Sequence, residues 1–267
     1  MTDQAFDFGF DVRENGVAVL TLDRPATLNS LTFEIYGQLE QLFLDLQTDD
    51  SVKVVVLTGA GKGFCSGGNV EEIIAKLLEM DGAQTLAFTR MTGAVIRNMR
   101  QLKKPIVGAI NGVTAGAGTV LALACDMRIL SERATFAFLF CKVGLTGADM
   151  GAAYLLPRIV GTGRASELLM LGDKIDAAEC YRIGIANRVV PEDQLMEAAL
   201  EIADRLADGP LLATAVTKQM LLSEESMDLS SAIEQEAQAQ AVLLCANDHR
   251  EFYEAWKEQR KPNFKGN

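Results

Sequence analysis

The chain of 267 residues carries 25 Lys and Arg against 36 Asp and Glu, a formal net charge of −11 at pH 7. With 49% hydrophobic and 23% charged residues its composition is ordinary for a globular protein, which argues against a disordered or fibrous chain. The acidic balance argues against binding to a nucleic-acid backbone, although a few local donors can still hold one small anionic ligand.

The cysteines and the apolar stretches predict a cellular compartment. The five cysteines show no paired close spacing, so they predict no zinc site, redox pair or disulfide framework and fit a reducing environment. The first ten residues lack the basic flank and apolar core of a signal peptide, and apolar runs end well before membrane-spanning length. We therefore expect a soluble, cytoplasmic protein.

The order strand, glycine turn and helix occurs twice in the first half of the chain. In chain order the patterns predict a strand at 17–22, a helix from 32, a strand at 52–57, a glycine-rich passage at 58–69, a helical segment from 70, a helix at 85–102, a strand at 106–110, glycine-containing residues 115–118 and a helix at 119–125. The apolar runs at 52–57 and 106–110 are typical of parallel strands buried on both faces. These elements predict an α/β core.

The second half of the chain is mostly helical. A short strand is expected at 187–190, and the pattern from 192 to the end predicts three or four helices rich in Ala, Leu and Glu. No linker rich in Pro, Gly or Ser separates the two halves. We expect a helical C-terminal region that need not fold alone.

The two glycine loops predict a site for developing negative charge. The glycines of 59–63 match neither a phosphate loop nor a dinucleotide fingerprint, and they could simply allow positive φ and close packing. However, each loop follows a buried strand and opens a helix, so each presents free N–H groups at a positive helix end. Two such groups aimed at one point would form an oxyanion hole for a carbonyl oxygen.

Seven segments, in this order, resemble the crotonase (enoyl-CoA hydratase/isomerase) superfamily. They are 22–29 (LDRPATLN), 64–69 (FCSGGN), 110–118 (INGVTAGAG), 123–126 (LACD), 156–161 (LPRIVG), 184–191 (GIANRVVP) and 261–266 (KPNFKG). The resemblance implies a crotonase-like spiral of ββα turns that binds acyl-CoA in residues 1–190, and a helical trimerisation region in residues 191–267. It also implies an acyl-CoA thioester substrate, no cofactor beyond the coenzyme A of that substrate, and a homotrimer or dimer of trimers.

The resemblance further implies the residues of the site. The two N–H donors would fall at Ser66 and Ala117. The two glutamates with which hydratases of this family deliver water would fall at Val120 and Phe140, and neither side chain can move a proton. Asp149 falls where several members carry a catalytic aspartate, and the single-aspartate epoxyphenylacetyl-CoA isomerase pattern is nearest.

Asp149 also has a purely structural interpretation. Placed before an apolar helical segment, it could be an N-cap with a lowered pKa. We favour the catalytic role because Phe138, Phe140 and nearby apolar residues would form a dry acyl pocket, together with Val120. Desolvation in such a pocket raises the pKa of a carboxyl group toward the range useful for proton transfer.

Contacts to coenzyme A are expected at two ends of the chain. By resemblance they fall on Arg24, Ala26, Leu28, Gly67, Phe252 and Lys265. Arg24 could equally be a solvated charge in a turn, and the C-terminal residues could simply cover the surface.

These residues together predict an isomerase. The amides would hold the thioester oxygen while Asp149 removes a proton from the acyl chain and returns it at another carbon, with no metal or redox cofactor. Two alternatives stay open. One is an enoyl-CoA hydratase in which Asp149 and a second group, such as Glu71, Glu72 or Glu79, orient water. The other is an acyl-CoA-binding protein without catalytic activity.

Overall fold

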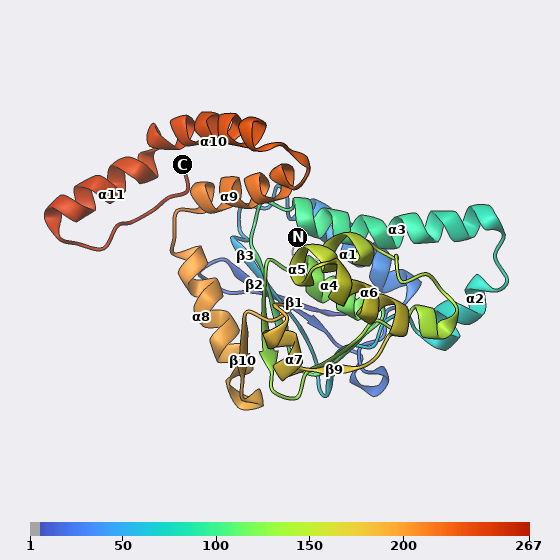
Figure 1. Cartoon of the computed structure of the whole chain (residues 1–267). Helices are drawn as coiled ribbons and strands as arrows, with labels where there is room; N and C mark the ends of the chain where they lie inside the picture. The colour runs from blue at the N-terminus through green and yellow to red at the C-terminus, as the bar shows by residue number, and fades with distance from the viewer. Residues whose placement is uncertain (1–5) are drawn as a thin grey trace.

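The structure, a computed structural model, describes residues 6–267. Residues 1–5, which include half of the segment examined for a signal peptide, lie outside the described residues. Within the described chain the strands form a six-stranded sheet in the order β1-β2-β3-β5-β7-β10 and a four-stranded sheet in the order β4-β6-β8-β9. Helices pack on the sheets, and the last helices extend away from them (Figure 1).

The larger sheet is parallel except at one edge. Its strands are β1 (Gly9–Val12), β2 (Val17–Leu22), β3 (Val54–Gly59), β5 (Ile106–Ile110), β7 (Met127–Ser131) and β10 (Arg188–Val190). Only β1 runs antiparallel to its neighbour, β2. All six residues of β3 and all five of β5 are buried, as the continuous apolar runs predicted for strands covered on both faces.

The smaller sheet consists of very short strands, which the sequence patterns did not predict. They are β4 (Gly63–Cys65), β6 (Val113–Ala115), β8 (Thr135–Ala137) and β9 (Ile175–Asp176). β4, β6 and β8 pair in parallel, and each follows a strand of the larger sheet directly in sequence. The successive strand pairs β3–β4, β5–β6 and β7–β8 therefore form the turns of a spiral, and the predicted ββα fold is confirmed.

Several of the helices begin where the sequence supplies a side-chain capping group. The helices are α1 (Phe33–Asp45), α2 (Ala75–Leu77), α3 (Gly82–Gln101), α4 (Ala117–Ala124), α5 (Ala152–Val160), α6 (Thr162–Leu171), α7 (Ala177–Arg182), α8 (Leu195–Ala207), α9 (Leu211–Ser223), α10 (Leu229–Leu244) and α11 (Asn247–Glu258). Thr32 caps α1 by accepting from the Ile35 N–H, and Asp81 forms a capping box with Gln84 at α3. The segment predicted to be helical from Val70 starts as one turn of π-helix (Val70–Ile74) before α2.

The two faces of the larger sheet have different covers. One face packs in the main core, where residues of α1, α3, α4 and α5 are buried. The opposite face packs on α8, whose Leu195, Ala199 and Ile202 contact a cluster of strand residues that includes Val54 and Ile129. The boundary predicted after residue 190 therefore separates α8 from the sheet on which it packs.

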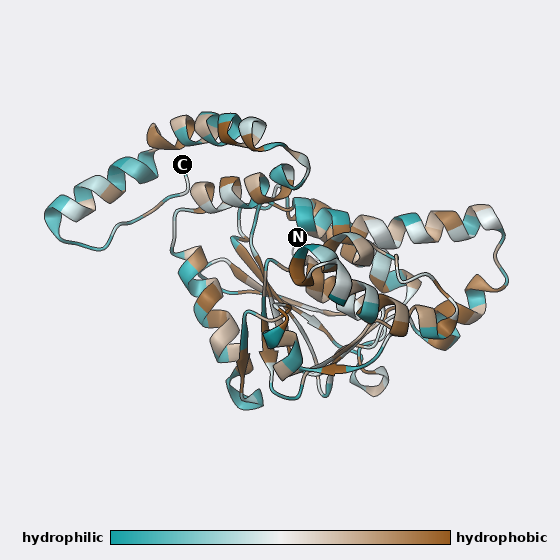
Figure 2. Cartoon of the chain, viewed as in Figure 1, coloured by the Kyte–Doolittle hydropathy of each residue, from teal (hydrophilic) through white to brown (hydrophobic). Residues whose placement is uncertain are grey.

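Helices α9, α10 and α11 form an arm that extends away from the sheets (Figure 1). α9 buries only Lys218, α10 buries no residue, and α11 buries only Asp248 and Ala255. Figure 2 shows that α11 is largely hydrophilic, whereas α9 and α10 mix both kinds of residue. Nowhere in residues 6–267 is a helix both long and apolar enough to cross a membrane.

Candidate active site

The two glycine loops meet at the ends of β4 and β6. A Cβ added to Gly67, whose φ is +97°, would lie 3.1 Å from the Ala115 carbonyl oxygen and 3.4 Å from the Ala117 nitrogen. A Cβ added to Gly118 would lie 2.1 Å from the Cys65 carbonyl oxygen. The loops can therefore approach each other only because glycine stands at both positions.

The structure corrects the first predicted donor. The Ser66 N–H donates to the Leu28 carbonyl oxygen at 2.9 Å, so it is not free for a ligand. The Ser66 hydroxyl is also engaged, because it donates to the Thr27 carbonyl oxygen at 2.8 Å. The prediction that Ser66 supplies an oxyanion donor is therefore wrong.

The free amide of this loop belongs to Gly68. Leu31 N–H donates to the Gly67 oxygen and Asn69 N–H donates to the Leu31 oxygen, so Gly68 lies between them in a parallel bridge. In that pairing the N–H of the middle residue points away from the partner strand. Within residues 6–267 no acceptor lies in hydrogen-bonding range of this N–H. The two glycines after Ser66 are the sequence signal for this loop, but they do not show which of residues 66–68 has the free N–H group.

The second donor lies at the start of α4. Ala117 is the first residue of this helix, so its N–H has no partner inside the helix, and no other acceptor is present in the described chain. The helix dipole adds positive potential at this end. Because a Cβ added to Gly67 would lie 3.4 Å from the Ala117 nitrogen, the free amides of Gly68 and Ala117 belong to adjoining segments.

Asp149 is half-buried in the loop before α5, and its environment suits a base. Burial raises the pKa of its carboxyl group above the ordinary value, although the bond from the Met150 N–H at 2.9 Å partly opposes the rise. The alternative role as an N-cap is wrong, since α5 is capped by Gly151 without any side-chain bond. The expected direction of the pKa shift is confirmed.

The three residues predicted to line the acyl pocket are all interior. Val120 and Phe138 are fully buried, and Phe140 is 6% exposed. Phe140 precedes a short 3₁₀ helix (Cys141–Val143) in the loop that leads to Asp149. Their contact with an acyl chain stays a prediction.

The residues predicted to contact coenzyme A are split between the core and the arm. The Arg24 guanidinium pairs with Glu72 and also donates to the Ser30 carbonyl oxygen, so part of its charge is already compensated. Gly67 lies in the loop described above, whereas Ala26 is exposed and Leu28 is half-buried in the turn after Arg24.

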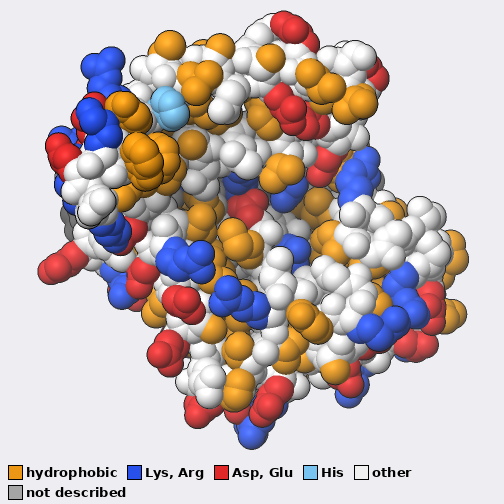
Figure 3. Space-filling model, turned by 60° about the vertical axis from the view of Figure 1, so that its left-hand side comes forward, with side chains coloured by type: hydrophobic (Ala, Val, Ile, Leu, Met, Phe, Trp, Pro, Cys, Tyr) orange, Lys and Arg blue, Asp and Glu red, His pale blue; other side chains and the backbone are white. Residues whose placement is uncertain are grey.

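At the other end of the chain, Phe252 of α11 is 51% exposed and Lys265 is exposed in the tail. Phe252 belongs to the arm and Lys265 to the tail that follows it, and Figure 3 shows hydrophobic side chains at the surface among charged ones. The contacts of all these residues with coenzyme A stay predictions.

Comparisons with known proteins agree with this geometry. Residues 12–267 match the family described as enoyl-CoA hydratase/isomerase. The chain is 34% identical to the 1,2-epoxyphenylacetyl-CoA isomerase of Escherichia coli K12, over 95% of this chain and 96% of the relative. It is 32% identical to the short-chain-enoyl-CoA hydratase of Clostridium acetobutylicum, over 93% and 94%.

Solved structures show the same likeness. A Streptomyces coelicolor A3(2) protein described as a candidate enoyl-CoA hydratase superposes with a TM-score of 0.97 at 48% identity, covering 100% of this chain and 97% of that one. An enoyl-CoA hydratase of Bacillus anthracis superposes with a TM-score of 0.92 at 32% identity, covering 98% and 100%. Relatives therefore carry both hydratase and isomerase names, and the choice between the two reactions depends on the site.

Proposed function

The chain belongs to the enoyl-CoA hydratase/isomerase family, and on that premise we propose that it shifts a double bond within an acyl-CoA thioester. The observation that carries the proposal is the presence of one half-buried carboxylate with a raised pKa, Asp149, which lies close to Tyr36 together with Cys65 of the first glycine loop. The positions at which the resemblance implied two glutamates are Val120 and Phe140, which cannot activate water.

The proposed reaction starts with binding of the thioester oxygen. The N–H groups of Gly68 and Ala117 donate to this oxygen, which withdraws electrons from the acyl chain and makes the α-protons more acidic. The amides are fixed by the backbone before substrate arrives, so little reorganisation is needed as negative charge develops. Their effect is larger in the dienolate than in the ground state, and this difference accelerates the reaction.

Asp149 then moves one proton between two carbons. Its carboxylate takes a proton from the α-carbon of a β,γ-unsaturated acyl group, and the electron pair spreads over the dienolate toward the thioester oxygen. The same carboxyl group returns the proton to the γ-carbon, so the double bond ends between the α- and β-carbons. A raised pKa favours this role, because a base whose pKa approaches the working pH both accepts and returns a proton efficiently.

The hydratase reading is the second candidate and has support of its own. The Clostridium acetobutylicum relative is named for hydration. Tyr36, a buried tyrosine of α1 near Asp149, offers a second polar group. Of the glutamates considered for orienting water, Glu72 is already paired with Arg24. Hydration also asks for two groups around one water molecule, whereas the double-bond shift asks for one carboxylate.

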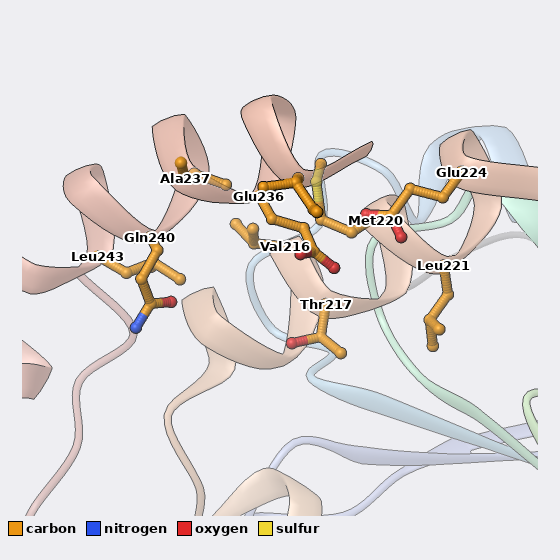
Figure 4. A pocket seen from close by; sticks show the side chains of 11 residues that line it. Val216, Thr217, Met220, Leu221, Glu224, Glu236, Ala237, Gln240 and Leu243 are labelled. Atoms are coloured by element: carbon orange, nitrogen blue, oxygen red, sulfur yellow. The ribbon is translucent and has the colours of Figure 1, made fainter. Parts of the chain in front are cut away.

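The arm suggests how copies of the chain assemble. A groove of about 530 Å³ runs between α9 and α10, and Figure 4 shows Val216, Met220 and Leu243 around it. Ile233, also in its lining, is 54% exposed. We propose that this apolar surface is covered by another copy of the chain in a homotrimer, since exposed apolar grooves of this kind commonly mark interfaces.

The experiment that tests the reaction compares two substrates and two variants. Wild-type enzyme is incubated with crotonyl-CoA and with β,γ-unsaturated hexenoyl-CoA, and products are identified by mass spectrometry. We expect conjugated hexenoyl-CoA to form rapidly and hydroxybutyryl-CoA to form slowly or not at all. Asp149→Asn should lower the isomerisation kcat by about 10²- to 10⁴-fold.

The matched control is Asp176→Asn, since Asp176 caps α7 through the Glu179 N–H and asparagine caps equally well. It should isomerise at the wild-type rate. Rapid hydration of crotonyl-CoA would favour the second candidate. Absence of turnover of both substrates in the wild-type protein, with acetyl-CoA still bound, would favour a protein that only binds acyl-CoA.

A further inference from the structure

Tyr36 of α1 is a buried tyrosine that the sequence patterns marked only as part of a helix. Its side chain is 3% exposed, and its ring meets the Phe88 ring of α3 edge-on with centroids 5.8 Å apart. Phe88 also packs on Phe33, one helical turn before Tyr36, at 4.8 Å. The packing of α1 on α3 therefore fixes the direction of the phenol.

The Tyr36 hydroxyl has a poor hydrogen-bond partner. It donates to the Met150 sulfur at 3.9 Å, and a thioether is a weak acceptor. Elsewhere in residues 6–267 no carbonyl or carboxylate oxygen accepts from it, whereas buried tyrosine hydroxyls normally bond an oxygen or nitrogen. A phenol in this position is not explained by stability, because a phenylalanine would fill the same space without burying a hydroxyl.

Tyr36 lies between the two halves of the candidate site. The pKa of its hydroxyl is raised well above the ordinary value, first by burial and then by the neighbouring Cys65 and Asp149. Cys65 belongs to the first glycine loop, and Asp149 is the proposed base. The phenol therefore stays protonated at neutral pH, and its O–H is available to donate a hydrogen bond.

Met150 connects Tyr36 to Asp149. Its N–H donates to the Asp149 carboxylate at 2.9 Å, and its side chain is 7% exposed against the Tyr36 hydroxyl. Its φ is +49°, a left-handed conformation that costs a non-glycine residue about 1 kcal/mol. A contact that holds the Met150 side chain also holds the backbone amide that orients the carboxylate.

We infer that Tyr36 is a positioning residue, whose hydroxyl holds Met150 and through it turns the Asp149 carboxylate toward the two free amides. The inference rests on the proposed function, in which Asp149 is the base. It adds a residue of α1 to a site otherwise built from loops that follow β4, β6 and β8.

Two substitutions remove the contact from opposite sides. Tyr36→Phe deletes the hydroxyl and keeps the ring against Phe88, and Met150→Leu deletes the sulfur with nearly the same volume. The double variant, Tyr36→Phe with Met150→Leu, completes a cycle, and Tyr181→Phe is a matched control because Tyr181 is 60% exposed. Each variant is assayed with β,γ-unsaturated hexenoyl-CoA and with crotonyl-CoA, acetyl-CoA affinity is measured by calorimetry, and thermal midpoints are recorded.

The two single variants should each lower kcat on the order of tenfold, because misplacing a catalytic group is costly, while KM and acetyl-CoA affinity stay within about twofold. The double variant should resemble the singles, since both substitutions break one contact. Wild-type kcat in Tyr36→Phe, or effects of the two singles that multiply, would overturn the inference. So would a fall in kcat that only follows a lowered thermal midpoint.

The same assays separate this inference from the proposed function. If Asp149→Asn is inactive and Tyr36→Phe is not impaired, the positioning role fails and the proposed base remains. If Asp149→Asn keeps the wild-type kcat, both fail together.

Discussion

Strand β3 and helix α10 differ in how many of their residues are buried by the rest of the chain. All six residues of β3 are buried within the chain, and none of the sixteen residues of α10 is. The arm nevertheless carries large apolar residues, with Leu229, Ile233 and Val242 between 54% and 75% exposed. The apolar residues of the core are therefore buried by the same chain, whereas the exposed apolar residues of the arm fit a surface that contacts another molecule.

The two parts are joined by a small charged contact. The Lys218 ammonium of α9 is buried against the core and donates to the Asp126 carboxylate at 2.7 Å and to the Lys104 carbonyl oxygen at 2.9 Å. Asp126 in turn accepts from the Ile106 N–H at the start of β5. Lys218 is thus the buried charge that anchors the arm to the sheet, and more exposed contacts, such as the Tyr154 hydroxyl donating to Glu225 at 2.7 Å, add to it.

The largest expected effect in this comparison comes from adding a single methyl group to the core. Gly118→Ala would place a Cβ 2.1 Å from the Cys65 carbonyl oxygen, so the two glycine loops must separate. We expect a loss of about 3 kcal/mol in the free energy of unfolding and loss of activity in the folded fraction. Urea unfolding and the isomerisation assay measure both.

Gly93→Ala is the matched control for this substitution. Gly93 lies inside α3 with no atom within 4 Å of its added Cβ. Alanine has the higher helix propensity there, so this variant should be more stable by up to about 1 kcal/mol. If Gly118→Ala were as stable and active as Gly93→Ala, the close packing of the loops would be refuted.

The next effect concerns the anchor of the arm. Lys218→Met leaves the Asp126 carboxylate without its strongest partner inside the protein, which we expect to cost about 2 kcal/mol of unfolding free energy. Lys257→Met, in exposed α11, should change stability by less than about 0.5 kcal/mol. Equal unfolding curves for the two variants would show that Lys218 does not anchor the arm.

Much of the core could be predicted because its elements have strong local signals. The strand at 17–22 and the strand at 106–110 were predicted with the bounds that the structure shows, and Thr32 was recognised at the start of α1. The smaller sheet was missed because its strands are two or three residues long. Such strands carry no periodicity, and the pairing of β4, β6 and β8 is set by the strand of the larger sheet that precedes each of them.

The site was predicted less completely, for reasons that lie in the backbone. Ala117 and Ser66 were both assigned by the family resemblance, and the N–H of Ser66 bonds Leu28 across the loop. Sequence cannot show which of several consecutive amides is left free. Tyr36 was missed because its position on α1 fits a core pattern, and only the tertiary structure brings it beside Met150.

A smaller effect follows from the buried base itself. Because burial raises the folded-state pKa of Asp149 above its unfolded value, the charged form destabilises the folded chain once the pH exceeds the folded pKa. Asp149→Asn should therefore have a higher thermal midpoint than wild type at neutral pH, and the difference should shrink as the pH falls through the folded pKa and vanish below the unfolded pKa. Calorimetry across acidic to neutral pH tests this, and a lower midpoint for the variant at neutral pH would contradict it.

The smallest effect on folding is expected in the arm. Ile233→Ser changes a residue that is 54% exposed, so the unfolding free energy of the single chain should change by less than about 0.5 kcal/mol. Assembly should respond more strongly, with a shift toward smaller species in size-exclusion chromatography coupled to light scattering. An unchanged assembly in Ile233→Ser, and also in Met220→Ser on the facing helix α9, would mean that the groove is not an interface.

The central claim is that one carboxylate moves a proton along an acyl chain whose thioester oxygen is held by two backbone amides. Incubation with β,γ-unsaturated hexenoyl-CoA that carries deuterium at the α-carbon, followed by mass spectrometry of the thioester, tests it most directly. The account predicts that the wild-type enzyme carries deuterium from the α-carbon to the γ-carbon while the conjugated product forms, and that Asp149→Asn binds the thioester but transfers no deuterium. Transfer at the wild-type rate in Asp149→Asn would contradict the account.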